Sequence, residues 1–250
     1  MIDSLAAREK NPLAAGVLAT LQENAIIAKE ERLPLCQDCG TTIVFAEIGQ
    51  EATLVGEPLE EAINSAVADA YDAYYLRKSI VGDPLRRQNT GTNTPALIHT
   101  SITSGTDIKL TVYLKGGGSE NMSCIKMFKP ADTQDDIIDY IVTQVKDAGS
   151  NPCPPLFLGV GIGGTADTAM LNAKLAVLRG ADTRHPDPFY AALEDVILAR
   201  INAEGCGAMG FGGTSSAAGV YIKEAPAHIA SLPVAVNMNC HSLRYAKRLI

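Results

Sequence analysis

Two closely spaced cysteines are the first residues in this chain whose types and spacing could do chemistry. Cys36 and Cys39 flank Gln37 and Asp38 in the stretch LPLCQDCGTT. A redox pair would need a helix that begins at the first cysteine, but the residues that follow are β-branched and typical of a strand. A structural zinc site would need a second close pair of ligands, and the remaining cysteines are isolated: Cys124, Cys153, Cys206 and Cys240. The local spacing therefore gives only weak support to either site.

Three of the cysteines lie at the predicted ends of strands. Cys36 precedes one strand, Cys153 precedes Pro154-Pro155 at the start of another, and Cys240 follows the apolar stretch PVAVNMN. Three thiolates suit an iron–sulfur cluster better than zinc, because soft sulfur ligands select such clusters. A cubane cluster normally takes four cysteines, so three would leave one iron free to act as a Lewis acid on a substrate hydroxyl. This pattern is typical of a dehydratase, and we interpret Cys124 and Cys206 as structural.

A glycine pattern supports a competing hypothesis. The stretch GVGIGG contains Gly159, Gly161 and Gly164, and it lies between a predicted strand and a predicted helix. That context is typical of a dinucleotide site, which also needs a second strand ending in an acidic residue about 20 residues further on. Asp182 has the distance but directly follows a helix. We therefore favour a tight strand-to-helix turn, whose helix N-terminus could hold a small anion such as a carboxylate.

Composition excludes several classes of protein. The chain has 250 residues, 46% hydrophobic and 20% charged, which is typical of a globular protein with a sizeable core. A net charge of −7 and the lack of a basic stripe argue against nucleic-acid binding. No apolar run approaches the roughly 20 residues needed to span a bilayer, and the start lacks a signal-peptide core, so we expect a cytoplasmic protein without membrane contact. Its thiols should stay reduced and serve metal binding, catalysis or packing.

The elements that must position these residues alternate between helix and strand. Apolar periodicity predicts helices over residues 5–30 (with a break at Asn11-Pro12), 57–78, 132–149, 165–180 and 187–204. Strands are predicted at 42–49, 107–115, 156–164, 218–224 and 232–239. Polar or glycine-rich loops separate them, and no internal repeat or low-complexity linker is present. The alternation favours a single mixed α/β domain over residues 1–250, although the sheet order cannot be derived.

Six motifs, in order from about residue 15 to the end, give a more specific indication. They are CQDCGT, NTGTNTP, GGGSENMS, NPCPPLFLGVGIGGT, GAMGFGGTSS and PAHIASLPVAVNMNC. Together they resemble the α subunit of the iron–sulfur-dependent hydro-lyases, the class I fumarase and tartrate dehydratase family. The resemblance implies an α/β catalytic domain that encloses a [4Fe–4S] cluster with one open iron site. It also implies that Cys36, Cys153 and Cys240 are the cluster ligands.

The resemblance further implies individual roles for residues near the proposed cluster. Asp38 matches the residue that acts as an acid or base beside the hydroxyl-bearing iron. Gln37 matches a substrate-binding amide, and Arg77 matches a guanidinium that faces a substrate carboxylate, which is suited to bidentate pairing. Gly117 would offer a backbone contact to the substrate, and His228 matches a histidine near it. The other histidines, His99, His185 and His241, we interpret as structural.

The chain departs from the family at two places. Cys39 stands where the family usually has Thr, so it is either an alternative ligand or a site sensitive to oxidation. The chain stops at Ile250, whereas single-chain family members continue into a second domain with the remaining catalytic base. We therefore expect that this β domain is absent here and that a separate β subunit supplies it. With homodimerising α subunits, the complex would be a heterotetramer.

The expected reaction is the reversible dehydration of a small 2-hydroxy dicarboxylate, with malate to fumarate favoured. The GGGSENMS loop favours this fumarase reaction over the alternatives, which are the α subunits of tartrate dehydratase and of mesaconate hydratase. Two hypotheses from other classes remain open. The first is a dinucleotide-binding oxidoreductase that uses GVGIGG, and the second is a zinc-stabilised interaction subunit.

Overall fold

The computed structural model describes residues 1–250, which form two compact units. The first unit comprises Met1–Leu33 and Gly118–Ser242, and the second comprises Pro34–Gly117 and Leu243–Ile250. Each unit contains one four-stranded sheet together with helices, so the predicted mixed α/β class is confirmed. Each unit is assembled from two separate segments, which explains why the sequence shows no linker between them. The prediction that residues 1–250 act as one catalytic domain stays a prediction.

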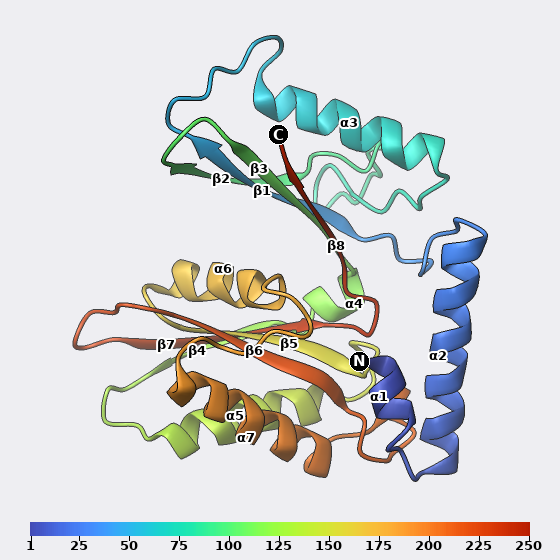
Figure 1. Ribbon diagram of the computed structural model, residues 1–250, viewed down its shortest axis with the longest axis vertical. Coiled ribbons are helices and arrows are strands. Elements are labelled where there is room, and N and C mark those ends of the chain that lie inside the picture. The colour runs from blue at the N-terminus through green and yellow to red at the C-terminus, as the bar shows by residue number, and fades with distance from the viewer. The chain divides into compact units, whose positions relative to one another are not determined.

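The sheet of the first unit has the strand order β4-β7-β5-β6. Its strands are β4 (Cys124–Phe128), β5 (Leu156–Gly163), β6 (Ala217–Ala225) and β7 (Leu232–Asn239). β5 pairs parallel with β6 and antiparallel with β7, and every residue of β5 is buried. Figure 1 shows α6 (Ala166–Val177) on one face of this sheet, and α5 (Gln134–Ala148) and α7 (Pro188–Glu204) on the other. The main hydrophobic core lies between β4–β7 and the α5 and α7 layer.

Local sequence signals determine where the helices of the first unit begin. The predicted break at Asn11-Pro12 is confirmed, since it separates α1 (Ile2–Ala6) from α2 (Pro12–Glu30). The Asn11 side chain accepts hydrogen bonds from the first backbone N–H groups of α2. α5 begins with a capping box, in which Thr133 and Asp136 each accept a hydrogen bond from the other's backbone N–H. These contacts satisfy donors that the first turn of a helix otherwise leaves unpaired.

The glycines of GVGIGG allow α6 to pack directly on β5. A Cβ atom at Gly159 would lie 1.9 Å from the carbonyl oxygen of Ala173, and one at Gly161 would lie 1.9 Å from that of Ala169. Side chains at either position would therefore push α6 off the sheet. Gly164 has a φ of 70° in the turn that follows, a conformation that favours glycine. Backbone packing thus accounts for this glycine pattern, as the interpretation as a tight strand-to-helix turn predicted.

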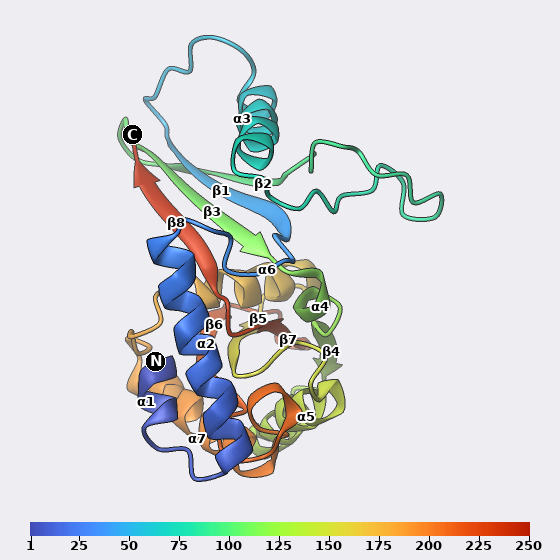
Figure 2. The same cartoon turned by 90° about the vertical axis from the view of Figure 1, so that its right-hand side faces the viewer.

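The sheet of the second unit has the order β2-β1-β3-β8. Its strands are β1 (Thr41–Gly49), β2 (Leu97–Thr103), β3 (Ile108–Lys115) and β8 (Arg244–Leu249). β1 pairs parallel with β2 and antiparallel with β3, and β3 pairs antiparallel with β8. Figures 1 and 2 show α3 (Leu59–Ala73) along one face of this sheet. β2 and β8, which are exposed edge strands, and the short strand β4 were not predicted from the sequence.

Further segments differ from the structure predicted for them. α3 ends at Ala73, before the predicted end at residue 78, and Tyr75 has a φ of 53°, which a helix does not accommodate. Arg77 therefore lies in the loop after α3. The predicted glycine loops contain short helical turns, which are α4 (Gly117–Glu120) and a 3₁₀ turn, η1, at Ala208–Gly210.

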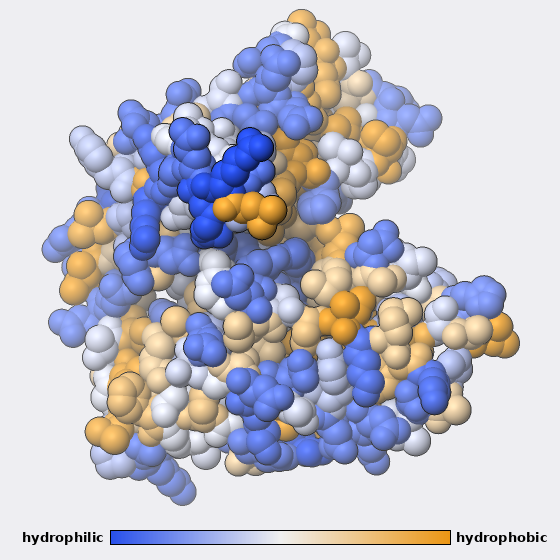
Figure 3. Space-filling view, turned by 180° about the vertical axis from the view of Figure 1, so that it is seen from behind, coloured by the Kyte–Doolittle hydropathy of each residue, from blue (hydrophilic) through white to orange (hydrophobic).

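None of the helices combines the length and the apolar composition that crossing a bilayer requires. The face of the molecule drawn in Figure 3 mixes hydrophilic and hydrophobic residues. Large hydrophobic side chains are exposed in both units, among them Val55 and Tyr75 in the second and Ile229 in the first.

Candidate functional site

The segment that links α2 to β1 holds Asp38 in a fixed orientation. One carboxylate oxygen of Asp38 accepts a hydrogen bond from the backbone N–H of Gly40 at 3.1 Å, and the other accepts one from the N–H of Gly117 at 2.8 Å. A Cβ atom at Gly116 would lie only 3.1 Å from the same carboxylate. The chain between β3 and α4 therefore has the small residues that this close approach needs. Gly117, predicted to contact the substrate through its backbone, here donates to Asp38.

Cys39 joins this segment to the loop that carries Arg77. Its side chain is buried, with 3% of its surface exposed, and its sulfur accepts a hydrogen bond from the backbone N–H of Arg77 at 3.1 Å. The same thiol lies 3.7 Å from the carbonyl oxygen of Cys36. The hydroxyl group of Tyr71 lies 3.1 Å and 3.0 Å from the carbonyl oxygens of Cys39 and Gly40. These contacts favour a positioning role for Cys39 over the two roles considered from the sequence.

Asn93 is a second residue that connects the segment carrying Asp38 to the loop after α3, and it was not selected from the sequence. Its side chain is fully buried, and its carbonyl oxygen accepts hydrogen bonds from the backbone N–H groups of Ser79 at 2.6 Å and Ile80 at 3.2 Å. Its amide nitrogen donates to the carbonyl oxygen of Gly40 at 3.1 Å. The backbone of Asn93 has a φ of 60°, a conformation that Asn tolerates better than most residues. Asn93 holds the loop after Arg77 in place. Its position in the NTGTNTP motif is the one sequence feature that could have pointed to it.

Two further predicted site residues, Arg77 and Gln37, are accessible. The guanidinium of Arg77 is exposed and makes no hydrogen bond or ion pair, so it is available to an anion. Gln37 is also exposed, and its side-chain oxygen accepts a hydrogen bond from the thiol of Cys36 at 3.3 Å. The second unit thus brings together five predicted site residues: Cys36, Gln37, Asp38, Arg77 and Gly117.

In the first unit, the loops that carry Cys153 and Cys240 meet. Cys153 lies between α5 and β5, is exposed, and has a φ of 56°, an unusual conformation for a residue with a side chain. Its carbonyl oxygen accepts a hydrogen bond from the backbone N–H of His241 at 3.2 Å and lies 3.3 Å from that residue's Nδ1. The thiol of Cys240 lies 3.1 Å from the hydroxyl of Ser242. His241, which we interpreted as structural, therefore connects two of the three predicted ligands.

Burial affects the six cysteines to different degrees. All six are free thiols. Burial raises the pKa of Cys124 and of Cys206, which keeps these thiols protonated, in agreement with their interpretation as structural. Cys153 is exposed, whereas Cys36 and Cys240 are half-buried like Cys124 and Cys206, so exposure alone does not single out the three predicted ligands.

Three accessible sulfur donors fit an iron–sulfur cluster better than a metal that prefers oxygen or nitrogen. Cys36 belongs to the second unit, and Cys153 and Cys240 belong to the first. The chain shows no group of three or more His, Cys, Asp or Glu side chains in a metal-binding arrangement. The donor chemistry, rather than an assembled geometry, is therefore what fits the predicted cluster.

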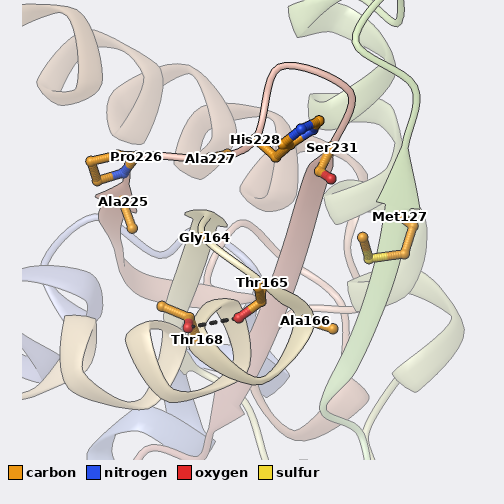
Figure 4. A pocket seen from close by; sticks show the side chains of 10 residues that line it. All are labelled: Met127, Gly164, Thr165, Ala166, Thr168, Ala225, Pro226, Ala227, His228 and Ser231. Carbon is orange, nitrogen blue, oxygen red and sulfur yellow. Dashed lines mark hydrogen bonds between the residues drawn. The ribbon is translucent and has the colours of Figure 1, made fainter.

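His228 lines a pocket of about 410 Å³ in the first unit. Figure 4 shows His228 and Ser231 on the loop between β6 and β7, and Thr165 and Thr168, which share a hydrogen bond, at the start of α6. Nδ1 of His228 accepts a hydrogen bond from the N–H of Ala230 at 3.1 Å, which leaves Nε2 as the nitrogen that carries the proton. His228 makes no hydrogen bond to Cys153 or Cys240, so its predicted role beside the substrate stays a prediction.

The N-terminus of α6 already pairs with a carboxylate of its own. A hydrogen bond from the Thr165 hydroxyl, with others from the backbone N–H groups of Thr168 and Asp167, lowers the pKa of Asp167 below its ordinary value. Asp167 is therefore ionised at neutral pH and lies where the helix dipole favours a negative charge. A small anion at this helix N-terminus, as considered from the sequence, would have to compete with it.

Comparison with known proteins gives a consistent result. A family model described as "Fumarate hydratase (Fumerase)" matches residues 1–248. A protein of Methanocaldococcus jannaschii named "Putative L(+)-tartrate dehydratase subunit alpha" is 40% identical over 250 aligned positions, which cover 97% of this chain and 87% of that protein. The L(+)-tartrate dehydratase subunit alpha of Escherichia coli strain K12 is 29% identical over 245 positions, which cover 97% of this chain and 80% of that protein.

Proposed function

Because this chain belongs to the fumarate hydratase (Fumerase) family and is a hydro-lyase, we propose that it is the α subunit of an enzyme that removes water from L(+)-tartrate. The observation that carries the proposal is the 40% identity, over 97% of this chain, to a protein named as a tartrate dehydratase α subunit. The sequence analysis favoured malate and kept tartrate as an alternative, and the named relatives support that alternative better. Malate stays the second candidate, because the family model is described as fumarate hydratase.

The two candidate reactions give different products. Elimination removes the hydroxyl group from one carbon of the diacid and a proton from the neighbouring carbon, and the two leave as water. Tartrate has a second hydroxyl on the carbon that loses the proton, so its product is an enol that becomes oxaloacetate. Malate lacks that hydroxyl, so its product is fumarate. A product assay therefore distinguishes the two substrates.

We assign most of the substrate contacts to the site residues of the second unit. The exposed, unpaired guanidinium of Arg77 is suited to bind a substrate carboxylate with two parallel hydrogen bonds. The amide of Gln37 contacts the polar part of the substrate. Asp38 handles the proton on the leaving hydroxyl, and its two backbone hydrogen bonds, from Gly40 and Gly117, hold the carboxylate in one orientation. His228 contributes a further contact through its Nε2–H.

The proposed cofactor is a [4Fe–4S] cluster held by Cys36, Cys153 and Cys240. When bound, the cluster supplies an iron with an open position, a Lewis acid that polarises the substrate hydroxyl. The exposed, free thiol of Cys153 and the hydrogen bond that joins the loops of Cys153 and Cys240 support the choice of these two ligands. After anaerobic reconstitution, Cys153→Ser should reduce the iron and sulfide content, whereas the control Cys124→Ser should retain it. A full cluster in Cys153→Ser would contradict the ligand assignment.

A separate β subunit is the proposed partner. The support is that the relatives are named as alpha subunits. We expect the α subunits to form a homodimer that binds two β subunits. Dehydration by the α chain alone, at a rate that a β subunit does not change, would refute this part of the proposal, and size-exclusion chromatography with light scattering tests the heterotetramer.

The decisive experiment measures both reactions with the cluster-loaded α subunit and its β subunit under anaerobic conditions. Oxaloacetate formed from L(+)-tartrate and fumarate formed from malate are followed separately. We expect the larger kcat/KM with L(+)-tartrate, and Arg77→Ala should raise KM for either diacid. A larger kcat/KM with malate would favour the second candidate, and no dehydration of either diacid would refute the proposal.

A further inference from the structure

Arg244 is the first residue of β8, and its side chain contacts the segment that carries Asp38. Its Nη1 donates a hydrogen bond to the backbone carbonyl oxygen of Asp38 at 2.6 Å. The space above Gly116 lies close to both side chains, since a Cβ atom there would be 3.1 Å from the Asp38 carboxylate and 3.7 Å from Nη2 of Arg244. Nothing in the local sequence around Arg244 points to a contact with Asp38.

The strand pairing explains how Arg244 reaches this position. In the antiparallel ladder, Arg244 lies opposite Leu114, and the chain then leaves β3 through Lys115 and Gly116 to Gly117. β8 therefore delivers the guanidinium to the point where the N–H of Gly117 meets the Asp38 carboxylate. Asp38 is thus held through its carboxylate by the backbone N–H groups of Gly40 and Gly117, and through its carbonyl oxygen by Arg244.

The hydrogen bond to Asp38 is the one hydrogen bond that the Arg244 side chain makes. Its Nε is buried and has no hydrogen-bond partner. An unpaired buried donor costs about 1–3 kcal/mol, so a side chain keeps such a position only where other interactions require it. The planar guanidinium is also a rigid donor that a lysine ammonium does not reproduce.

We propose that Arg244 is a positioning residue that aligns Asp38 for proton transfer. The inference rests on the proposed function, in which Asp38 handles the proton on the leaving hydroxyl. Because Arg244 acts through Asp38, its loss should lower kcat and leave KM for the diacid nearly unchanged.

The test compares Arg244→Gln and Arg244→Lys with Arg248→Gln, a matched control on the same strand whose side chain is exposed. Each variant is assayed with the β subunit for kcat and KM, using the better of the two diacids. Misplacement of a catalytic group by about 1 Å costs up to about 100-fold in rate. We expect a 10- to 100-fold lower kcat in Arg244→Gln, partial recovery in Arg244→Lys, and no change in Arg248→Gln.

A second readout does not depend on activity. In the full α chain labelled with ¹⁵N-glycine, the amide resonance of Gly117 reports its hydrogen bond to Asp38, and Gly117→Ala, which lacks that signal, identifies it. Arg244→Gln should shift it, whereas Arg248→Gln should not. If Arg244→Gln does not fold, Arg244→Lys carries both measurements.

The outcomes separate the two levels of the proposal. Wild-type kcat and an unshifted Gly117 resonance in the Arg244 variants, with Asp38→Asn inactive, would overturn the inference and leave the proposed function intact. A raised KM with unchanged kcat would make Arg244 a substrate contact and would also overturn it. If Asp38→Asn stays active, the role of Asp38 in the proposed function fails, and with it the catalytic role of Arg244.

Discussion

Replacing Cys39 by alanine tests whether the second cysteine of CQDC serves to position Arg77. Its thiol is buried and accepts a hydrogen bond from the backbone N–H of Arg77 at 3.1 Å. Alanine removes that acceptor and leaves a small cavity beside Gly40. The loop that carries Arg77 then loses its direct connection to the segment that carries Asp38.

Two magnitudes follow from this geometry. The lost hydrogen bond contributes about 0.5–1.5 kcal/mol to folding. Removing one buried heavy atom costs about 1 kcal/mol more, so the free energy of unfolding should fall by about 2 kcal/mol. If Arg77 loses one of two charged hydrogen bonds to a substrate carboxylate, binding weakens by at least about 1.5 kcal/mol. That change corresponds to about a tenfold higher KM.

The assay measures kcat and KM with the cluster-loaded enzyme, and urea unfolding with the α chain. Cys39→Ser retains a hydrogen-bonding side chain and should recover most of the affinity. Cys206→Ala is the matched control, because it removes a half-buried thiol that does not contact Arg77. Arg77→Ala gives the full effect of losing the guanidinium.

A wild-type KM in Cys39→Ala, together with a raised KM in Arg77→Ala, would refute the reasoning. It would show that the loop after α3 holds Arg77 without the hydrogen bond to sulfur. Loss of iron in Cys39→Ala, with the iron content unchanged in Cys206→Ala, would instead support the cluster-ligand role considered from the sequence.

Four other predictions concern stability. Gly159→Ala should destabilise the chain by about 3 kcal/mol, because a carbon–oxygen contact needs about 3.3 Å and the new Cβ would lie 1.9 Å from a carbonyl oxygen, which forces α6 to move by about 1.4 Å. Gly16→Ala, with nothing within 4 Å of the new atom, should instead stabilise α2 by about 0.5–1 kcal/mol. Glu194→Ala should cost about 3–5 kcal/mol, since it leaves the Arg179 guanidinium without its buried carboxylate partner. Burial raises the pKa of Glu9, but hydrogen bonds from Ser215 and from three backbone N–H groups outweigh it and hold the pKa below its ordinary value of 4.5. Glu9 therefore adds stability above about pH 4.5 that is lost as the pH falls through the lower folded pKa, and Glu9→Gln should remove this part of the acid dependence.

Urea unfolding followed by circular dichroism, repeated at several pH values for Glu9, checks these outcomes. Equal effects of Gly159→Ala and Gly16→Ala would contradict the packing explanation for the glycine motif. A neutral Glu194→Ala would mean that Arg179 finds another partner. An unchanged acid limb in Glu9→Gln would assign the acid sensitivity to other carboxylates.

The sequence by itself determined the local elements and the family. The break at Asn11-Pro12 and the capping box at Thr133 depend on hydrogen bonds between residues at most three positions apart, so they can be read from adjacent residues. The order of six motifs was specific enough to predict the family, which the comparison confirms. The roles assigned to the site residues stay predictions.

Only the tertiary structure decided how the site residues are held. Periodicity extended α3 to residue 78, but the helix ends at Ala73, and the backbone N–H of Arg77 in the following loop donates a hydrogen bond to the sulfur of Cys39. Apolar and polar residues do not alternate clearly along the edge strand β8, so it was not predicted. Its pairing with β3 is what places Arg244 beside Asp38. Arg244 and Asp38 are 206 positions apart in the chain. A contact across that separation forms only when the sheet of the second unit closes, because local sequence preferences act over a few residues and carry no information about which strands will meet.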